Sequence, residues 1–410
     1  MRICFISRRF FPAISGMSVY AANLLRELVD QGHEVTLISQ YRDDPEGRGV
    51  YGGGPPPEVP GVRVIGLEAR GEREGGHFER DIREMVEVVE REHARAPFDI
   101  IHAQYGYPTG LAALKASAST GVPNVVPIQG GDGHWVGSCC GTHARAMQAV
   151  LSHAGALLIG SRSFAEEVHE NHGVSPESFT IIPGAVDTRK FHPPPAGATD
   201  DGTSREPVLL YHGRVDRRKG ALDLLHAARR LADGGRDFRV AISGIGPDVG
   251  AAEELASGLG LSDNVEFTGY AAYEETPRVY READVFVSPT YAEGFSNTIL
   301  EAMATGLPVV STRSVGVVDC LTDGENALLV EPGHPEELAE ALESLLDDES
   351  LRRRLAERAL SEAREVYAWP AIASRIEAVY RSLLGTAPDS EWSLDETIEP
   401  CRFRDAPHLL

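Results

Sequence analysis

Lysine is scarce in this chain, which has three lysines among 39 basic residues and 410 residues in total. Long apolar runs are absent as well: no stretch approaches the roughly 20 apolar residues that a transmembrane helix needs, so none is expected. The apolar run at the N-terminus ends at Arg8 and Arg9 and is too short for a signal peptide. We expect it to form a first strand instead.

Cysteine is also rare, and its spacing excludes the common zinc-binding and redox motifs. The sequence has no C-x-x-C motif and no paired framework of cysteines, so we expect no disulfides, no bound metal and a reducing, cytoplasmic setting. The five cysteines are Cys4, Cys139, Cys140, Cys320 and Cys401.

The chain has an excess of acidic residues, with 62 Asp and Glu and a net charge of −23. This charge argues against nucleic acid as a partner, because phosphate backbones bind basic surfaces. Residues 1–192 carry 18 basic and 23 acidic residues, whereas residues 193–410 carry 21 and 39. An acidic surface with arginine in place of lysine is typical of halophilic proteins, whose self-repulsion is screened by salt. A GC-rich genome is the alternative, but it explains only the arginine.

Short strand-like runs alternate with amphipathic helices, a rhythm typical of parallel, doubly wound α/β sheets. The rhythm pauses at 193–207, where a run rich in Pro, Gly, Ser and Asp predicts a linker. We therefore predict two Rossmann-like domains, at 1–192 and 208–366. The strand-like runs are RICFIS, EVTLIS, FDIIHA, NVVPI, ALLIG and FTIIP in the first half, and VLLYHG, FRVAISG, NVEFTG, DVFVSP, LPVVST and ALLVEP in the second.

Two segments lie outside this rhythm. Residues 77–96 form a charged amphipathic helix whose polar face mixes both signs, which favours packing on the sheet over a membrane anchor. The tail at 385–410 is polar, acidic and interrupted by proline, so we expect it to be flexible. The apolar face of the helix consists of Phe78, Ile82, Met85, Val86 and Val89.

The stretch EGFSNTILEAMATGLPVV places Glu293 and Glu301 eight positions apart around a predicted helix start, with Ser296 as N-cap and Gly306 as C-terminal stop. The helix would follow the strand DVFVSP, where its first amides favour an anion such as phosphate. Glu301 falls off the apolar face, so we do not expect it in the core. Carboxylates repel phosphate, and the pair is expected to bind hydroxyls on either side of it. A solvated Glu301 is the alternative.

Two cations follow another predicted strand, in the stretch HGRVDRRKG. Arg214 stands at the end of that strand and Lys219 just before the next helix, so both are candidates to bind phosphate oxygens. The scarcity of lysine gives the position of Lys219 particular weight. The neighbouring Arg217 and Arg218 are expected to be solvated.

The glycine-rich stretch GIGPDVG begins at Gly244 and differs from the G-x-G-x-x-G motif of dinucleotide-binding proteins by one residue. It also lacks the carboxylate that such proteins place about 20 residues later. We therefore interpret this stretch as a turn whose backbone closely approaches a base or ribose, and not as a dinucleotide-binding motif.

Together these features resemble the family-4 retaining glycosyltransferases, the glycosyltransferase group 1 family, which have the GT-B fold. The resemblance runs from the first strand to about residue 384 and is strongest between Tyr211 and Pro332. It rests on Glu293 and Glu301, on GRVDRRKG and on the GIGP turn. Further similar segments are ISGMSVYAANLLRELVDQGHEV near the N-terminus, IPGAVDTRKFHP before the linker and YAWPAIASRIEAVYRSLL at 367–384.

The resemblance implies two Rossmann-like doubly wound domains that face each other across a cleft, with the helix at 367–384 packed back on the first. It implies an acceptor bound by the first domain and a nucleotide-diphosphate sugar, with UDP or GDP, bound by the second. Glu301 would hold the ribose, and Glu293, Arg214 and Lys219 would be catalytic. The donor-binding residues would be Gly16, Arg214, Lys219, Gly244, Glu293, Gly294, Phe295, Ser296, Asn297 and Glu301.

The acceptor side departs from the family pattern. Gln129, in QGGDGHW, stands where the family often has a histidine, so Asp132 and His134 are the candidates there. The glycine pair common after the first strand is here Ser15 and Gly16, which leaves Gly16 to approach the phosphate.

No two aspartates stand two positions apart, so the Asp-x-Asp motif with which many sugar transferases hold a metal is absent. We expect metal-independent transfer of a hexose on one face of the sugar, without a cofactor and without a covalent intermediate. The acceptor would be a glycan, a lipid-linked glycan or a small molecule, reached in the cytoplasm or at the inner membrane face. Three alternatives stay open: a nucleotide-sugar epimerase, a phosphorylase with pyridoxal phosphate, and a non-catalytic sugar-nucleotide-binding subunit.

Overall fold

The computed structural model describes residues 1–13, 15–43, 53–195 and 205–407. These residues form two compact units: unit 1 consists of Met1–Pro183 with Ile372–Leu410, and unit 2 of Gly184–Ala371. The predicted boundary at residue 192 falls a little later in the chain than this division. Most of the predicted linker 193–207 lies outside the described residues.

Unit 1 is built on a parallel sheet with the strand order β3-β2-β1-β4-β5-β6-β7. The inner strand β1 is buried from Ile3 to Ser7, as expected of a strand with helices on both faces. The strands are β1 Arg2–Ser7, β2 Glu34–Tyr41, β3 Val62–Glu68, β4 Ile100–Gln104, β5 Asn124–Ile128, β6 Ala156–Ile159 and β7 Phe179–Ile181.

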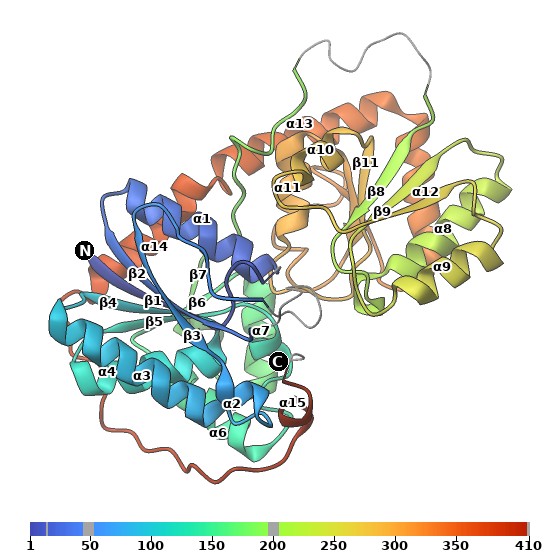
Figure 1. Ribbon diagram of the computed structural model, residues 1–410. Coiled ribbons are helices and arrows are strands. Elements are labelled where there is room, and N and C mark those ends of the chain that lie inside the picture. Colours follow the sequence, from blue (N-terminus) through green and yellow to red (C-terminus); the bar gives the residue numbers. More distant parts are fainter. Residues whose placement is uncertain (14, 44–52, 196–204, 408–410) are drawn as a thin grey trace. The chain divides into compact units, whose positions relative to one another are not determined.

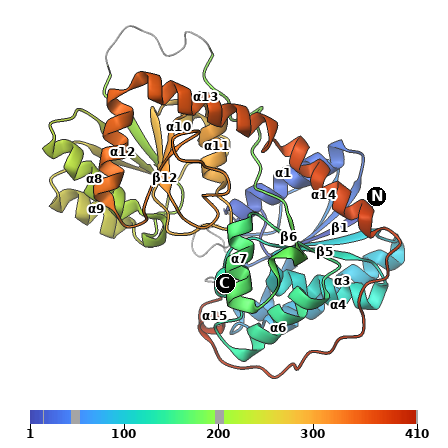
Figure 2. The same ribbon diagram turned by 180° about the vertical axis from the view of Figure 1, so that it is seen from behind.

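Helices cover both faces of this sheet, with α1 and α14 on one face and α3, α4 and α6 on the other (Figures 1 and 2). The helices of unit 1 are α1 Gly16–Asp30, α2 Arg70–Arg73, α3 Phe78–Arg95, α4 Leu111–Thr120, α5 Gly131–His134, α6 Gly141–His153, α7 Arg162–His172, α14 Trp369–Leu383 and α15 Arg402–Asp405, with a π-helical turn at Gly106–Gly110 and a 3-10 turn at Pro176–Ser178. The first residues of α14 belong to unit 2.

Unit 2 repeats the arrangement with the parallel order β10-β9-β8-β11-β12-β13. One apolar core lies under α8, α9 and α12, and a second lies under α10, α11 and α13. The elements are β8 Val208–His212, a 3-10 turn Arg217–Lys219, α8 Ala221–Asp233, β9 Arg239–Ser243, α9 Val249–Gly258, β10 Val265–Gly269, α10 Thr276–Arg281, β11 Val285–Ser288, α11 Asn297–Thr305, β12 Val309–Thr312, β13 Leu328–Val330, α12 Pro335–Asp347 and α13 Glu349–Glu365.

The predicted fold class of two parallel α/β domains is confirmed. Each strand-like run that the sequence analysis named coincides with a strand of the structure, and β3 is the strand it did not name. In α3, Val88 rather than Val86 completes the buried face. Among the described residues, no helix combines the length and the apolar character that crossing a membrane requires.

The C-terminal tail, which we expected to be flexible, makes contacts with unit 1 in the structure. Residues 386–407, which we call the strap, run along unit 1 and make side-chain contacts with it at several points. Near its end, Phe403 is buried, and Arg404 forms an ion pair with Glu79 on α3 at 2.5 Å. Ion pairs and the buried ring of Phe403 attach the strap to unit 1, and its low hydrophobicity does not predict such contacts.

Candidate functional site

The strand order of unit 2 reverses between β8 and β11, because β9 and β10 lie on one side of this pair and β12 and β13 on the other. In open α/β sheets, ligands bind at the carboxyl ends of the strands where the order reverses. The loops that leave β8 and β11 carry Arg214, Lys219 and Glu293, three of the predicted site residues.

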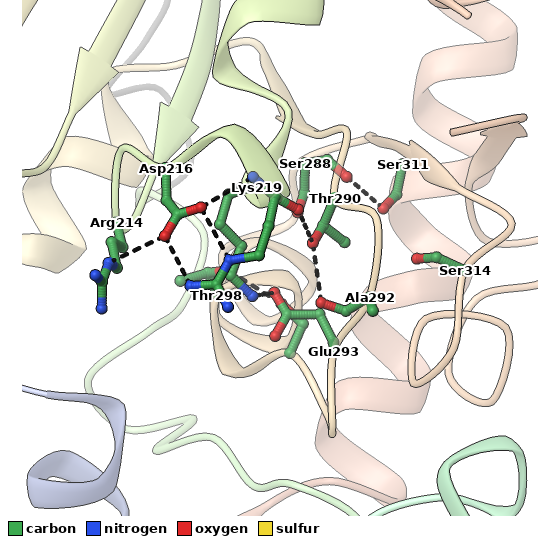
Figure 3. Close-up of polar contacts among 12 residues, drawn as sticks. Arg214, Asp216, Lys219, Ser288, Thr290, Ala292, Glu293, Thr298, Ser311 and Ser314 are labelled. Carbon is green, nitrogen blue, oxygen red and sulfur yellow. Dashed lines mark hydrogen bonds and ion pairs between the residues drawn. The ribbon is translucent and has the colours of Figure 1, made fainter. Parts of the chain in front are cut away.

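Lys219 and Glu293 meet at this edge of the sheet (Figure 3). The Lys219 ammonium lies 2.5 Å from Oε1 of Glu293, and the two side chains are 31% and 19% exposed. Two residues 74 positions apart, predicted to touch the same donor, are therefore in direct contact. Since both remain partly open to solvent, a ligand can reach them and exchange this ion pair for bonds to itself.

The two loops are held together by the backbone. Gly220 has φ +72°, and a Cβ atom at this position would lie 1.9 Å from the carbonyl oxygen of Pro289. The amide of Tyr291 donates to the carbonyl of Arg218 at 2.9 Å. Only glycine combines this left-handed conformation with such a close approach, and this contact places Lys219 next to the loop of Glu293.

Asp216 organises the cations of the first loop and was missed by the sequence analysis. Its Oδ2 lies 3.4 Å from Nε of Arg214 and 2.9 Å from Nη2 of Arg218. The hydrogen bonds from Arg218 lower the pKa of Asp216 to about 2, although burial opposes this effect. Arg217 and Arg218 are exposed, as predicted, but each is paired with an aspartate. A carboxylate two residues after Arg214 was the signal that could have identified this role.

The helix α11 begins and ends where the sequence predicted. Ser296 is its N-cap and Gly306 ends it with φ +79°. The Ser296 hydroxyl does not cap the helix; it contacts the Thr298 hydroxyl at 3.1 Å instead. Phe295, predicted to help bind the donor, packs with its ring 5.9 Å from that of Tyr367 against the core of unit 2. Its backbone rather than its ring is therefore the part available near the helix start.

The expectation that Glu301 stays out of the core is wrong. The residue is 8% exposed, and its Oε2 accepts a hydrogen bond from the Tyr280 hydroxyl at 2.9 Å. Helix α10 covers the face of α11 that periodicity assigned to solvent, so the neighbouring helix, not the pattern of α11, sets this burial. Burial raises the pKa of Glu301 to about 7, against the opposing effects of the Tyr280 hydrogen bond and of Lys190.

The packing of two loops requires a glycine at position 244. Its φ is +153°, and a Cβ atom there would lie 1.7 Å from the carbonyl oxygen of Gly213. The loop after β9 thus packs directly against the loop after β8. The close backbone approach predicted at the GIGP turn occurs here between two protein segments.

The sheet of unit 1 reverses its order between β1 and β4. Gly16, the predicted phosphate contact, is the first residue of α1 after β1, and the space around its missing side chain is open to at least 4 Å. Three arginines surround one buried carboxylate nearby: Arg8, Arg9 and Arg42 lie 2.9, 3.8 and 3.1 Å from the oxygens of Glu72. Burial raises the pKa of Glu72, but the arginines outweigh it and the net shift is downward. Together with Gly53 and Gly54, these four residues line a pocket.

Asp132 and His134, the residues predicted for the acceptor side, form hydrogen bonds and an ion pair within unit 1. Asp132 is fully buried and accepts hydrogen bonds from the amides of Gly106, Gln129 and Gly130 at 2.7–3.0 Å. Burial raises the pKa of Asp132 to about 6, and these backbone bonds oppose the rise. His134 contacts Glu167, with 2.5 Å between Nδ1 and Oε1. Asp132 therefore shapes the loops after β4 and β5.

Comparisons with known proteins agree with this architecture. The family model of the group 1 glycosyl transferases matches residues 201–362, and that of the glycosyl transferase 4-like domain matches residues 15–185. The chain is 28% identical over 420 residues to the D-inositol 3-phosphate glycosyltransferase of Corynebacterium diphtheriae, with 93% of this chain and 94% of that protein covered. It is 28% identical over 433 residues to the MMP alpha-(1->4)-mannosyltransferase of Mycolicibacterium hassiacum, with 94% and 98% covered.

Solved structures share the fold. Sucrose-phosphate synthase from Thermosynechococcus elongatus superimposes with a TM-score of 0.78 at 24% identity, over 94% of this chain and 100% of that one. Anabaena HepE, solved in complex with UDP and glucose, gives a TM-score of 0.73 at 18% identity, over 93% and 100%. This likeness confirms the predicted GT-B fold class, that is, two α/β domains with parallel sheets.

Proposed function

The chain belongs to the group 1 glycosyltransferases, and from this premise we propose that it moves a hexose from a nucleotide-diphosphate donor to its acceptor with retention of the anomeric configuration. The observation that carries the proposal is the meeting of Lys219 and Glu293 where the strand order of unit 2 reverses. A cation and a carboxylate at such an edge suit a ligand with a diphosphate and hydroxyl groups.

Each residue has a role that follows from its place. Lys219 and Arg214 leave the loop after β8 and bind the diphosphate, helped by the first amides of α11. Glu293 accepts hydrogen bonds from hydroxyls of the donor sugar, and Glu301 accepts those of the ribose. Donor binding replaces the ion pair between Lys219 and Glu293 with one contact to each part of the donor.

Transfer breaks the bond between the anomeric carbon and the diphosphate oxygen, and the electron pair stays with the diphosphate. Fixed positive charge aimed at that oxygen stabilises the transition state without reorganisation. The acceptor oxygen attacks the same face, and its proton passes to the departing oxygen. We propose that no metal ion takes part, because Lys219 and Arg214 supply this charge and the sequence has no Asp-x-Asp.

The donor assignment is tested by melting and by turnover. UDP-hexoses and GDP-hexoses are added singly to the purified chain without Mg²⁺ or Mn²⁺, and the donor that binds raises the melting temperature. With that donor, nucleotide release should be slow alone and fast with acceptor, and the product should keep the donor's anomeric configuration by NMR. Two results would contradict the proposal. One is conversion of the donor to its epimer, and the other is donor binding without nucleotide release whichever acceptor is added.

We further propose that the acceptor carries an anionic group bound by the arginines around Glu72. Three guanidiniums contact the Glu72 carboxylate in that pocket, and guanidinium groups suit the planar recognition of a phosphate or carboxylate. The name of the Corynebacterium diphtheriae relative includes an inositol phosphate, which is consistent with a phosphorylated acceptor.

Arg42 provides the test of this acceptor site, because its side chain is 22% exposed whereas that of Glu72 is buried. Arg42→Gln should raise the KM for a phosphorylated acceptor by about 10–100-fold, the value of one hydrogen bond to a charged group. The donor-induced rise in melting temperature should stay unchanged. The control is Arg63→Gln, which removes an exposed arginine paired with Glu92 on the same domain. Equal acceptor KM values in the two variants would contradict the anionic acceptor.

A further inference from the structure

Three thiols and one imidazole converge in unit 1, on residues that the donor assignment does not use. This thiol–imidazole cluster consists of Cys139, Cys140, His143 and Cys401, whose ligand atoms all lie within 4.8 Å of one another. Its members come from the start of α6 and, 258 positions later, from the strap. We propose that the cluster binds one zinc ion, which fastens the strap to unit 1.

One imidazole nitrogen faces all three sulfurs of the cluster. Nδ1 of His143 lies 3.1, 3.4 and 3.5 Å from the sulfurs of Cys139, Cys140 and Cys401. A ring nitrogen has either one proton or one lone pair, so it cannot form a full hydrogen bond with all three sulfurs at once. The other ring nitrogen, Nε2, is buried and contacts no polar partner among the described residues. The polar end of the imidazole therefore points only at sulfur.

A tetrahedral metal accounts for all three distances. With Zn–S of about 2.3 Å and Zn–N of about 2.0–2.1 Å, the edges of a tetrahedron are about 3.6 Å between nitrogen and sulfur and about 3.8 Å between sulfurs. The separations between nitrogen and sulfur, 3.1–3.5 Å, are about 0.1–0.5 Å shorter than these edges. Three thiolates and one imidazole form the Cys₃His ligand set of structural zinc sites.

The local structure prepares the ligands for a cation. Cys140 is the N-cap of α6 and His143 lies in its first turn, so both side chains are fixed by the helix start. The His143 ring is buried among aromatic rings, with that of Tyr107 at 4.7 Å and that of Phe78 at 5.9 Å, which fixes its orientation. Cys401 is the N-cap of α15, the short helix of the strap.

Polar contacts on both sides of Cys401 bring the strap to this position. Glu399 accepts a hydrogen bond from the amide of Gly141 at 2.8 Å, and its other oxygen lies 3.1 Å from Arg145. Arg404 donates to the carbonyl oxygen of Gly76 at 2.9 Å. The four protein ligands complete a tetrahedral zinc sphere and leave no position for a substrate. The ion is therefore structural, and the proposal of metal-independent transfer at the donor site does not depend on it.

The proposal is tested on the full chain purified under reducing conditions from cells supplied with zinc. Elemental analysis should find one zinc per chain, and replacement by Co²⁺ should give the intense visible absorption of tetrahedral cobalt bound to thiolates. Cys401→Ser should lose most of the metal and melt several degrees lower. The matched control, Cys320→Ser, changes a buried thiol bonded to the Val317 carbonyl outside the cluster, and it should keep one zinc per chain.

The cobalt spectrum of the unchanged chain keeps the test decisive if Cys401→Ser does not fold. Three results would overturn the proposal. The first is a reduced chain without bound metal that still melts as the zinc-supplied chain does. The second is a disulfide between Cys401 and either neighbour, detected by mass spectrometry without reduction. The third is a brown protein containing iron and sulfide.

Discussion

Replacing Lys219 by alanine should lower kcat by about 10²–10³-fold, the loss seen when one fixed donor to a developing oxyanion is removed. In the proposed function, the ammonium stabilises the charge that the leaving diphosphate gains. In the structure, its partner is the Glu293 carboxylate. Its removal takes away the stabilising charge and leaves that carboxylate next to the diphosphate. The effect should fall on kcat more than on KM, because the charge develops in the transition state.

The measurement is steady-state transfer with the donor identified by melting. Lys115→Ala is the matched control: it also removes one of the three lysines, but on α4 of unit 1, where Lys115 pairs with Glu396 of the strap. Lys219→Arg should recover part of the rate, because it restores the charge but not the compact shape. Full activity of Lys219→Ala would remove Lys219 from the mechanism and with it the main support for the donor site.

The fold was predictable because parallel strands buried on both faces are continuous apolar runs that periodicity identifies. β3 is different: Arg63 and Gly66 interrupt its apolar residues, and its positions are mostly partly exposed. A strand at the sheet edge carries less of the core and so has a weaker pattern.

The site was predictable where one local segment determines it, and it was not where two segments must meet. Ser296 and Gly306 mark the two ends of α11 in the sequence, although the Ser296 hydroxyl makes no capping bond. The burial of Glu301 depends on Tyr280, 21 positions away on another helix. The thiol–imidazole cluster needs Cys401 beside His143, 258 positions apart, and no spacing rule covers that distance.

If Glu301 binds the ribose as proposed, its burial couples donor binding to stability. Burial raises the pKa of this carboxyl from 4.5 to about 7, so the folded chain binds the proton more tightly than the unfolded chain. The free energy of unfolding must then fall as pH rises from about 4.5 to 7. Above pH 7 the full cost of ionising this buried carboxyl reduces stability. A shift of this size corresponds to about 3 kcal/mol. Ionised Glu301 thus destabilises the chain in the state that binds hydroxyls best.

Glu301→Gln should therefore change stability and affinity in opposite directions. At pH 8 the variant should be more stable than the unchanged chain by about 2–3 kcal/mol, because a glutamine pays no cost of ionisation and still accepts the hydrogen bond from Tyr280. This advantage should shrink towards pH 5. The KM for the donor should rise by about 10–100-fold, since bonds from the ribose to a charged acceptor are lost.

Urea unfolding at pH 5.5, 7 and 8 and donor titration at pH 8 measure both effects on the same protein. Glu253→Gln, on the exposed face of α9, is the matched control and should change neither quantity. A destabilised Glu301→Gln at pH 8 would mean that the carboxylate is held by contacts stronger than the cost of its burial. A donor KM equal to that of the control would instead assign Glu301 to the packing of α10 on α11 and leave the ribose to another residue. The two results are independent, so stability tests the buried charge and affinity tests the proposed function.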